Sequence, residues 1–304
     1  MSNTKAKPFV TWVGGKRELL SEIRKRTIPF EKENGFTGTY YEPFLGGGSL
    51  FFDLQPKDAV LSDKNLHLIN AYWAVQNDVE GLIDELTELF EEHSKETYRE
   101  IRKTMNKAYH EMRHAFDNYS EKEIRREVTQ AKITSFAAEF MYLNRTCFNG
   151  LFRVNKKGDF NVPMGTHRPL VNEDNLKRCS EALKDADIRV GNFMGIERVP
   201  TMKGDFFFLD PPYHGKYSGY GSDGFRKEDH VMLKILCDQI TKRGGYFLLC
   251  NSDEKFILDL YKSYTIEVVE RQQTIAGKNE GRGAVRELLV SNYKPYDVMK
   301  KYDQ

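Results

Sequence analysis

The sequence predicts an α/β protein with a mostly parallel sheet, helices on both faces of that sheet, and a helical insertion in the middle of the chain. Strands and helices alternate in a β-turn-α-β pattern before residue 69, and they alternate again after residue 168. Between these two parts the sequence carries helix-period patterns without convincing strands. Alternation of this kind favours parallel strands joined by crossover helices. We therefore expect one domain formed by residues 1–68 and 169–304, and an inserted unit formed by residues 69–168.

The individual elements follow from hydrophobic periodicity and from turn residues. The predicted strands are residues 40–43, 59–62, 188–191, 205–209, 246–250 and 288–291. The predicted helices outside the insertion are residues 49–54, 172–184, 227–243 and 253–261. Inside the insertion we expect a long helix over residues 121–144, after a candidate cap at Ser120, and a β-hairpin over residues 146–163.

Composition sets broad limits on function. The 304 residues include 46 Lys and Arg and 45 Asp and Glu, so the formal charge of +1 neither demands nor excludes a polyanionic partner. A mean hydropathy of −0.62 argues against a membrane span and against a membrane partner. Residues 1–7 lack the apolar core of a secretion signal, so we expect a cytoplasmic protein. The four cysteines have no CxxC spacing, which favours buried, reduced thiols over zinc ligands or disulfides.

Charge is segregated within the insertion. Residues 76–92 contain seven acidic residues and no Lys or Arg. Residues 145–168 contain five basic residues against one acidic residue, a local charge of +4, with three phenylalanines between them. Such a hairpin suits contact with phosphates and base edges, and a solvated hairpin packed on its own body explains the pattern equally well.

A glycine-rich turn follows the first predicted strand. It contains Gly46, Gly47 and Gly48 before the helix at Ser49, and the next predicted strand leads to Asp63. Glycines let a backbone approach a ligand closely, and an acid at the tip of the second strand can bond ribose hydroxyls. Together they favour a nucleoside-containing ligand over an ordinary tight turn with a helix cap, and the absence of GxGxxG means that a dinucleotide is not implied.

The segment DPPY at residues 210–213 follows the apolar strand predicted at residues 205–209. Pro211 and Pro212 fix the backbone and offer no N–H, so the segment presents hydrogen-bond acceptors and an aromatic face. Acceptors at Asp210 and the Pro211 carbonyl suit an exocyclic amine, and Tyr213 can stack on the base that carries it. A plain Asp-Pro-Pro turn does not account for both the buried strand and the aromatic residue.

These segments resemble the DNA adenine-N6 methyltransferases of the α group, and more closely their Dam-type subfamily. The matching segments are FLGGG (44–48), DPPY (210–213), WVGGK (12–16), LNRTCFNGLFR (143–153), FNVP (160–163) and RELLV (286–290). They span nearly the whole chain in the order of the family. The resemblance implies a Rossmann-like S-adenosylmethionine-dependent methyltransferase sheet, with a DNA-recognition insertion of helices and a β-hairpin.

The resemblance also implies transfer of a methyl group from S-adenosylmethionine to the N6 amine of an adenine flipped out of double-stranded DNA, leaving S-adenosylhomocysteine, with no metal required. By position, the donor site comprises Trp12, Lys16, Phe44, Gly46, Asp63, Phe193 and Asp210. The catalytic segment comprises Asp210, Pro211, Pro212 and Tyr213, with Tyr213 stacked on the flipped adenine.

The same resemblance assigns the hairpin to DNA reading. Phe148 takes the place of an aromatic residue that wedges into the base stack, Asn149 and Arg153 face bases, and Pro163 belongs to the same surface. The phosphate candidates are Arg145, Lys156 and Lys157. Separately from the resemblance, the stretch 271–286 carries a local charge of +3, which favours contact with the DNA backbone over a simple exposed loop.

Two departures from the family pattern bear on specificity. Many GATC-methylating relatives have a lysine before the N-terminal tryptophan that reads the first guanine, whereas this chain has Thr11. After DPPY, residues 214–224 are glycine-rich, which is typical of a mobile loop, and His214 within it is expected to be a solvated residue or a phosphate contact. GATC or a GAT-containing variant is the first candidate site.

Other interpretations stay open from sequence. The same fold serves RNA adenine or the N4 amine of cytosine, and a third interpretation is a catalytically idle DNA-binding module. The sequence does not decide whether a cognate restriction endonuclease accompanies the protein, or whether the protein is a monomer or a weak dimer.

Overall fold

The computed structural model describes residues 5–27, 38–118, 129–166, 170–198, 201–214, 225–272 and 284–295, and it confirms the predicted α/β class. Seven strands form one sheet in the order β3-β2-β1-β4-β5-β7-β6. Their bounds are β1 (Tyr40–Glu42), β2 (Ala59–Asp63), β3 (Asp187–Val190), β4 (Phe206–Leu209), β5 (Tyr246–Ser252), β6 (Thr265–Gln272) and β7 (Ala284–Ser291). The pairs among β1 to β5 are parallel, while β7 runs antiparallel to both β5 and β6. The carboxyl ends of five strands therefore meet at one edge.

All six predicted strands are present, and β6 is the strand that the sequence analysis missed. β6 carries Glu267, Glu270 and Arg271 among its apolar residues, and it lies at the end of the sheet beside β7. Edge strands tolerate charged side chains, because a charged edge discourages pairing with another chain. A strand of this composition gives a weak hydrophobic signal.

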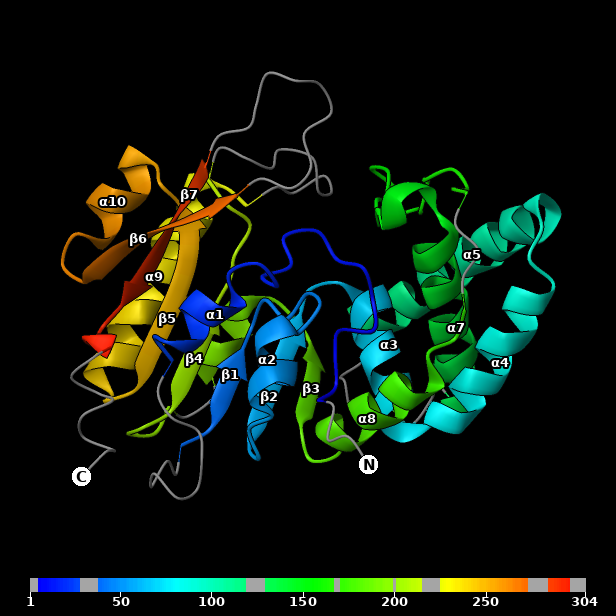
Figure 1. The fold of residues 1–304 in the computed structure, drawn as a ribbon, viewed down its shortest axis with the longest axis horizontal. Helices are drawn as coiled ribbons and strands as arrows, with labels where there is room; N and C mark the ends of the chain where they lie inside the picture. Colours follow the sequence, from blue (N-terminus) through cyan, green and yellow to red (C-terminus); the bar gives the residue numbers. More distant parts are fainter. Residues whose placement is uncertain are drawn as a thin grey trace.

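Helices cover both faces of the sheet, and Figure 1 shows the two layers. On β4, Phe206 and Phe208 belong to one buried cluster, whereas Phe207 and Leu209 belong to the other. Successive strand residues point to opposite faces, so each face of β4 supports its own core. α2 (Ser49–Leu54) contributes to the first cluster, and α9 (Lys227–Lys242) and α10 (Lys255–Tyr261) contribute to the second.

The insertion is helical, as predicted. α3 (Leu66–Asn77), α4 (Val79–Glu91), α5 (Lys95–Asn118) and α7 (Gln130–Thr146) lie together beside the sheet, with α8 (Glu173–Leu183) below them in Figure 1. α3 also contacts the sheet, because the Trp73 indole N–H donates to the Ile188 carbonyl in β3 at 2.9 Å. α3 spans the proposed domain boundary at residue 68, and the division into domains stays a prediction. Thr129 caps α7, while the predicted cap Ser120 lies outside the described residues.

The predicted hairpin over residues 146–163 contains turns and two isolated antiparallel bridges in place of continuous strands. The bridges pair Cys147 with Met164 and Val154 with Phe160. Between them, Phe148–Gly150 forms a short 3-10 turn in which Asn149 has φ 56° and Gly150 has φ 62°. Residues with a left-handed backbone conformation interrupt a strand. The two halves of the predicted hairpin therefore pair antiparallel, as expected, but they do not form continuous strands.

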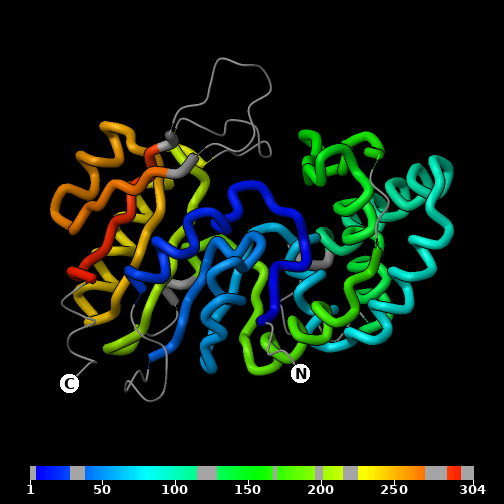
Figure 2. Tube along the Cα trace, viewed as in Figure 1, coloured from blue at the N-terminus to red at the C-terminus, as the bar shows by residue number. Residues whose placement is uncertain are grey.

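The N-terminal segment, residues 5–19, lies between the sheet and the helical group, where Figure 2 shows it in blue. The Asn175 side chain of α8 bonds both the N–H and the carbonyl of Lys7, at 2.9 and 2.8 Å. Asn144 of α7 does the same for Thr11, at 2.9 Å each. A side-chain amide can satisfy one donor and one acceptor, so each asparagine pins one residue of the segment.

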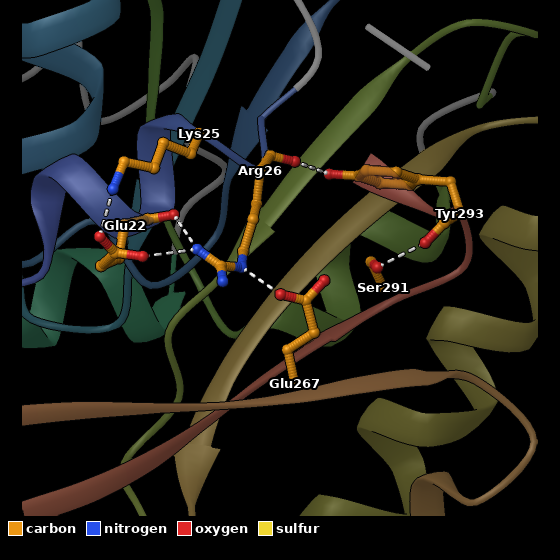
Figure 3. Close-up of polar contacts among 6 residues, drawn as sticks. All are labelled: Glu22, Lys25, Arg26, Glu267, Ser291 and Tyr293. Atoms are coloured by element: carbon orange, nitrogen blue, oxygen red, sulfur yellow. Dashed lines mark hydrogen bonds and ion pairs between the residues drawn. The ribbon is translucent and has the colours of Figure 1, made fainter. Parts of the chain in front are cut away.

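A polar cluster joins the segment after α1 (Leu20–Arg24) to the two antiparallel strands (Figure 3). The Arg26 guanidinium donates to Glu267 of β6 at 2.6 Å and to Glu22 at 2.9 Å. The Tyr293 hydroxyl donates to the Arg26 carbonyl at 2.6 Å, and Ser291 donates to the Tyr293 carbonyl at 2.7 Å. This cluster holds the first and last described parts of the chain together.

The four cysteines are buried and free, as expected. Among the helices that the structure describes, none is both long enough and apolar enough to span a bilayer.

Candidate active site

One open cleft of about 1670 Å³ lies where the strand ends meet the N-terminal segment and the insertion. Its lining includes every residue that the sequence analysis assigned to the methyl donor and to catalysis: Trp12, Lys16, Phe44, Gly46, Asp63, Phe193, Asp210, Pro211, Pro212 and Tyr213. In an open α/β sheet a ligand binds outside the carboxyl ends of the strands, so the cleft occupies the expected position.

The glycine turn is held tightly against Asp63. The Gly46 N–H donates to Asp63 Oδ2 at 3.0 Å, and the Asn65 N–H donates to Asp63 Oδ1 at 2.9 Å. Gly46 has φ 49°, and a Cβ there would lie 2.9 Å from Trp12 Cδ1, so only glycine fits. Burial raises the pKa of Asp63, and the two backbone N–H groups oppose that rise. A carboxylate has about four acceptor positions, so Asp63 retains capacity for ligand hydroxyls.

Three aromatic rings form one wall of the cleft. The Phe44 and Phe193 rings are stacked with their centroids 5.3 Å apart. Phe225, which the sequence analysis did not select, lies 5.9 Å from Phe44 and 5.7 Å from Phe193. The wall offers an apolar surface of the kind on which a planar ring packs.

An ion pair also lines the cleft. Lys16 Nζ lies 2.6 Å from Asp210 Oδ2, and it also donates to the Gly14 carbonyl at 2.7 Å. The same ammonium lies 4.9 Å from the centroid of the Tyr213 ring, within cation–π range. Asp210 Oδ1 is buried and has no hydrogen-bond partner among the residues that the structure describes. An unpartnered buried carboxylate oxygen is costly, and it is available to a donor brought by a ligand.

The protonation of this pair follows from its surroundings. Burial is the largest single influence on Lys16 and opposes its charge, but Asp210 acting together with Cys250 and Glu287 outweighs burial, and the pKa of Lys16 lies above its ordinary value. Burial raises the pKa of Asp210, and Lys16 opposes that rise. Nearby, burial raises the pKa of Glu42 to about 8, although the Tyr40 hydroxyl donates to Glu42 at 2.7 Å. Glu42 therefore carries a proton at neutral pH.

A sequence profile of the family described as D12 class N6 adenine-specific DNA methyltransferase matches residues 12–275. The chain belongs to this family. It is 36% identical over 296 residues to the type II methyltransferase M1.LlaDCHI of Lactococcus lactis subsp. cremoris, covering 94% of this chain and 95% of that protein. It is 35% identical to the type II methyltransferase M.MjaIII of Methanocaldococcus jannaschii, covering 94% and 99%. It is 31% identical to the DNA adenine methylase of Vibrio cholerae serotype O1, covering 94% and 96%.

The protein is thus an adenine-specific DNA methyltransferase with DNA as its substrate, and its sheet is the Rossmann-like methyltransferase sheet that the resemblance implied. Among the described residues, no group of three or more His, Cys, Asp or Glu side chains is arranged to hold a metal ion.

The DNA-binding candidates of the methyltransferase fall into two groups. Arg145 and Lys156 are exposed and line the cleft. The remaining candidates lie outside the cleft lining on the hairpin and are exposed to solvent: Phe148, Asn149, Arg153, Lys157 and Pro163. The first and last of these are paired, because the Phe148 N–H donates to the Pro163 carbonyl at 2.9 Å. Of the basic stretch 271–286, residues 273–283 lie outside the described range, as do residues 215–224.

His214 is partly buried in the methyltransferase. Its ring lies 4.8 Å from Phe256 and 5.5 Å from His230, and its backbone bonds Asn251 and Ser252. It therefore packs against α9 and α10 and is only partly exposed to the solvent in which the sequence analysis expected it. Its proposed phosphate contact stays untested.

Sequence reasoning missed four residues of this methyltransferase that shape the cleft or hold its lining: Tyr72, Asn144, Phe225 and Glu287. The Tyr72 hydroxyl donates to the Gly46 carbonyl at 3.1 Å, and the Tyr213 hydroxyl donates to Glu287 at 2.6 Å. Asn144 and Glu287 had a visible signal, because they lie in the segments 143–153 and 286–290 that carry the family resemblance. Tyr72 and Phe225 act through long-range contacts that leave no local pattern.

Proposed function

We propose that this methyltransferase takes its methyl group from S-adenosylmethionine and modifies an adenine flipped out of a short duplex site, with GATC or a GAT-containing variant as the first candidate. The observation that carries the proposal is the unpartnered, buried Oδ1 of Asp210, in the same cleft as the Gly46–Asp63 turn. A donor site and an acceptor for an amine thus share one space.

The residues of the cleft fit this donor. Asp63 has acceptor capacity for the ribose hydroxyls, and Phe44 and Phe193 offer a stacked aromatic surface for the adenine ring. Gly46 keeps the turn free of a side chain beside Trp12. When bound, S-adenosylmethionine supplies an electrophilic methyl group on a sulfonium centre. The roles of Asp63, Phe44, Phe193 and Gly46 in binding the donor are proposed together with the donor itself.

The catalytic segment suits the N6 amine of adenine. That amine is a poor nucleophile, because its lone pair is delocalised into the ring. Asp210 Oδ1 accepts one amine hydrogen, which favours the tetrahedral geometry that attack requires. Pro211 and Pro212 keep the segment rigid, and the Tyr213 ring stacks on the extruded base. The proton leaves after transfer, so no dedicated base is needed.

Recognition is assigned to the insertion formed by residues 69–168. Phe148 is 56% exposed on its 3-10 turn, which suits a side chain that wedges between bases. Asn149 and Arg153 are exposed for base contacts, while Arg145, Lys156 and Lys157 neutralise phosphates. Thr11 lies against Gly150, so residue 11 belongs to the same reading surface but has no long donor for a guanine.

The test uses labelled S-adenosylmethionine, duplex DNA and digestion of the product to nucleosides. We expect label in N6-methyladenine, and loss of transfer in Asp210→Ala with donor and duplex binding retained. Asp259→Ala is the matched control, because Asp259 is exposed on α10 beside Lys255.

Each other outcome contradicts part of the proposal. Normal methylation by Asp210→Ala means that the site is wrongly assigned. Label in N4-methylcytosine, or label in RNA but not in DNA, means that the substrate is wrong. Failure of the wild type to bind the donor in calorimetry supports an idle DNA-binding module.

A further inference from the structure

The Tyr213 hydroxyl makes a hydrogen bond that is not needed for stacking of the ring on a base. A base stacks on the face of an aromatic ring, and phenylalanine has the same face. In this structure the Tyr213 hydroxyl donates to Glu287 Oε2 at 2.6 Å. A hydrogen bond of this length to a carboxylate is of the strong, charge-assisted kind.

Glu287 comes from a distant part of the chain. It lies in β7, where it is the register partner of Ser252 in β5. Because β7 runs antiparallel to β5, its early residues lie at the edge where the parallel strands end. Glu287 is 3% exposed and lines the cleft, and the residues that follow it, 288–290, are buried and apolar. A carboxylate is costly at such a position unless it is well bonded.

The charge of Glu287 belongs to the network around Asp210. Asp210 and Glu287 are two of the carboxylates that favour the charged form of Lys16. Lys16 in turn lies over the Tyr213 ring and pairs with Asp210. Within the described part of the chain, Lys16, Asp210 and Glu287 are therefore linked to one another through Tyr213 and the Lys16–Asp210 ion pair.

Two other hydrogen bonds of this segment hold its backbone and do not involve the Tyr213 ring. The His214 N–H donates to Asn251 Oδ1 at 3.3 Å, and Ser252 Oγ donates to the His214 carbonyl at 3.0 Å. Both bonds fix the main chain one residue after Tyr213. The bond to Glu287 holds the hydroxyl at the far end of the Tyr213 ring, where it limits rotation and tilt of the ring.

We propose that Glu287 is a positioning residue for methyl transfer, which holds the Tyr213 ring in the plane on which the target adenine stacks, beside Asp210. The inference rests on the proposed function, since it assumes that Tyr213 stacks on the flipped base. In this proposal Glu287, a residue of β7, acts through Tyr213 and does not itself contact the reacting atoms.

The test compares Glu287→Ala, Glu287→Gln and Tyr213→Phe in steady-state methylation of duplex DNA. We expect Glu287→Ala and Tyr213→Phe each to lower kcat by about tenfold, with KM for the donor changed less than about twofold, because the lost bond orients the base rather than the donor. Glu287→Gln retains a carbonyl acceptor and is expected to stay within about threefold of the wild type. The double variant Tyr213→Phe with Glu287→Ala is expected to lose no more than either single variant, because both remove one interaction.

A spectroscopic readout separates positioning from a loss of stability. A duplex with 2-aminopurine at the target position reports extrusion of the base by a rise in fluorescence, and stacking on Tyr213 by quenching of that rise. We expect Glu287→Ala to extrude the base and to show weaker quenching than the wild type. Glu267→Gln is the matched control: Glu267 is a carboxylate of the neighbouring strand β6 and is bonded to Arg26 (Figure 3), and neither residue lines the cleft. Its loss is expected to lower thermal stability without changing kcat or quenching.

The outcomes distinguish this inference from the proposed function. Wild-type kcat and quenching in Glu287→Ala overturn the inference and leave the proposed function intact. A loss in Glu287→Gln as large as in Glu287→Ala, or additive losses in the double variant, also overturns it. Normal methylation by Asp210→Ala overturns the proposed function itself.

Discussion

Lys16 Nζ and Asp210 Oδ2 lie 2.6 Å apart, and this ion pair connects the N-terminal segment to the end of β4. Both side chains are largely buried, with exposed fractions of 9% and 17%. A buried carboxylate keeps its charge only when a cation or several donors offset its desolvation. Lys16 therefore controls the protonation of the residue that is proposed to accept the amine hydrogen.

Replacing Lys16 by methionine is expected to shift the pH dependence of activity. Without the ammonium the pKa of Asp210 rises further, and the proposed mechanism needs Asp210 ionised, so activity is lost at a higher pH than in the wild type. We expect the acid limb of kcat/KM to move upward by about one pH unit or more. Lys16→Arg, which keeps a positive charge, serves as the control. An unchanged acid limb in Lys16→Met means that Asp210 does not depend on Lys16.

Phe148 is expected to matter for activity and not for stability. Its side chain is 56% exposed, so Phe148→Ala removes little buried surface and should leave the melting temperature unchanged. If Phe148 wedges into the stack, the variant loses about tenfold or more in kcat/KM on duplex DNA. Leu170→Ala is the matched control, since Leu170 is 85% exposed and lies outside the hairpin. Equal kcat/KM for the two variants contradicts the wedge.

Arg153 and Lys156 are expected to act differently on DNA. Arg153 Nε donates to Asn161 Oδ1 at 3.0 Å, which directs the guanidinium, and a bidentate contact to guanine is worth about 1–3 kcal/mol of discrimination. Arg153→Ala should relax preference at one base position. Lys156→Ala should weaken binding to all sequences evenly. It should also lower by about 1 the slope of the logarithm of the binding constant against the logarithm of salt concentration. Binding titrations over a set of single-substituted duplexes at several salt concentrations measure both effects. An equal loss of affinity for every sequence in Arg153→Ala would mean that Arg153 contacts a phosphate and not a base.

A long donor at residue 11 is expected to sharpen specificity. Asn144 holds the N–H and the carbonyl of Thr11, and Thr11 lies against Gly150 of the hairpin, so the backbone of residue 11 is fixed on the reading surface. Thr11→Lys should raise the preference for guanine at the first position of the site by about tenfold, measured as kcat/KM on duplexes that differ at that pair. Thr11→Leu adds bulk without a donor and should not produce the preference. An equal rise in the preference for guanine in both variants would mean that side-chain size alone causes the preference.

Glu42 is expected to make the protein less stable as pH rises. Its pKa is about 8 in the folded chain against an ordinary value of 4.5. Between these values the unfolded chain releases the proton and the folded chain keeps it, so the stability present below 4.5 is progressively lost up to about 8. Relative to Glu42→Gln, the free energy of unfolding of the wild type should fall by about 1.4 kcal/mol for each pH unit in this window. Denaturant unfolding of both proteins over the window measures the difference, and parallel curves would show that Glu42 ionises normally.

The sequence by itself determined the fold class and most of the lining of the cleft. Strand and helix periods are local properties of the chain, so six of the seven strands could be recognised before any contact was known. Parallel strands bring their carboxyl ends to one edge, which is why Gly46, Asp63 and Asp210 could be assigned to one site from their positions after strands. β6 escaped because a charged edge strand has a weak hydrophobic pattern.

Only the tertiary structure decided which partners control those residues. Lys16 pairs with Asp210, Asn144 pins Thr11, and Glu287 bonds Tyr213, and each contact joins segments that are remote in the sequence. Burial also decided the protonation of Glu42, since the same carboxyl in water would be ionised. Hydrogen bonds and desolvation depend on which groups packing brings together, and no local pattern of residues encodes them.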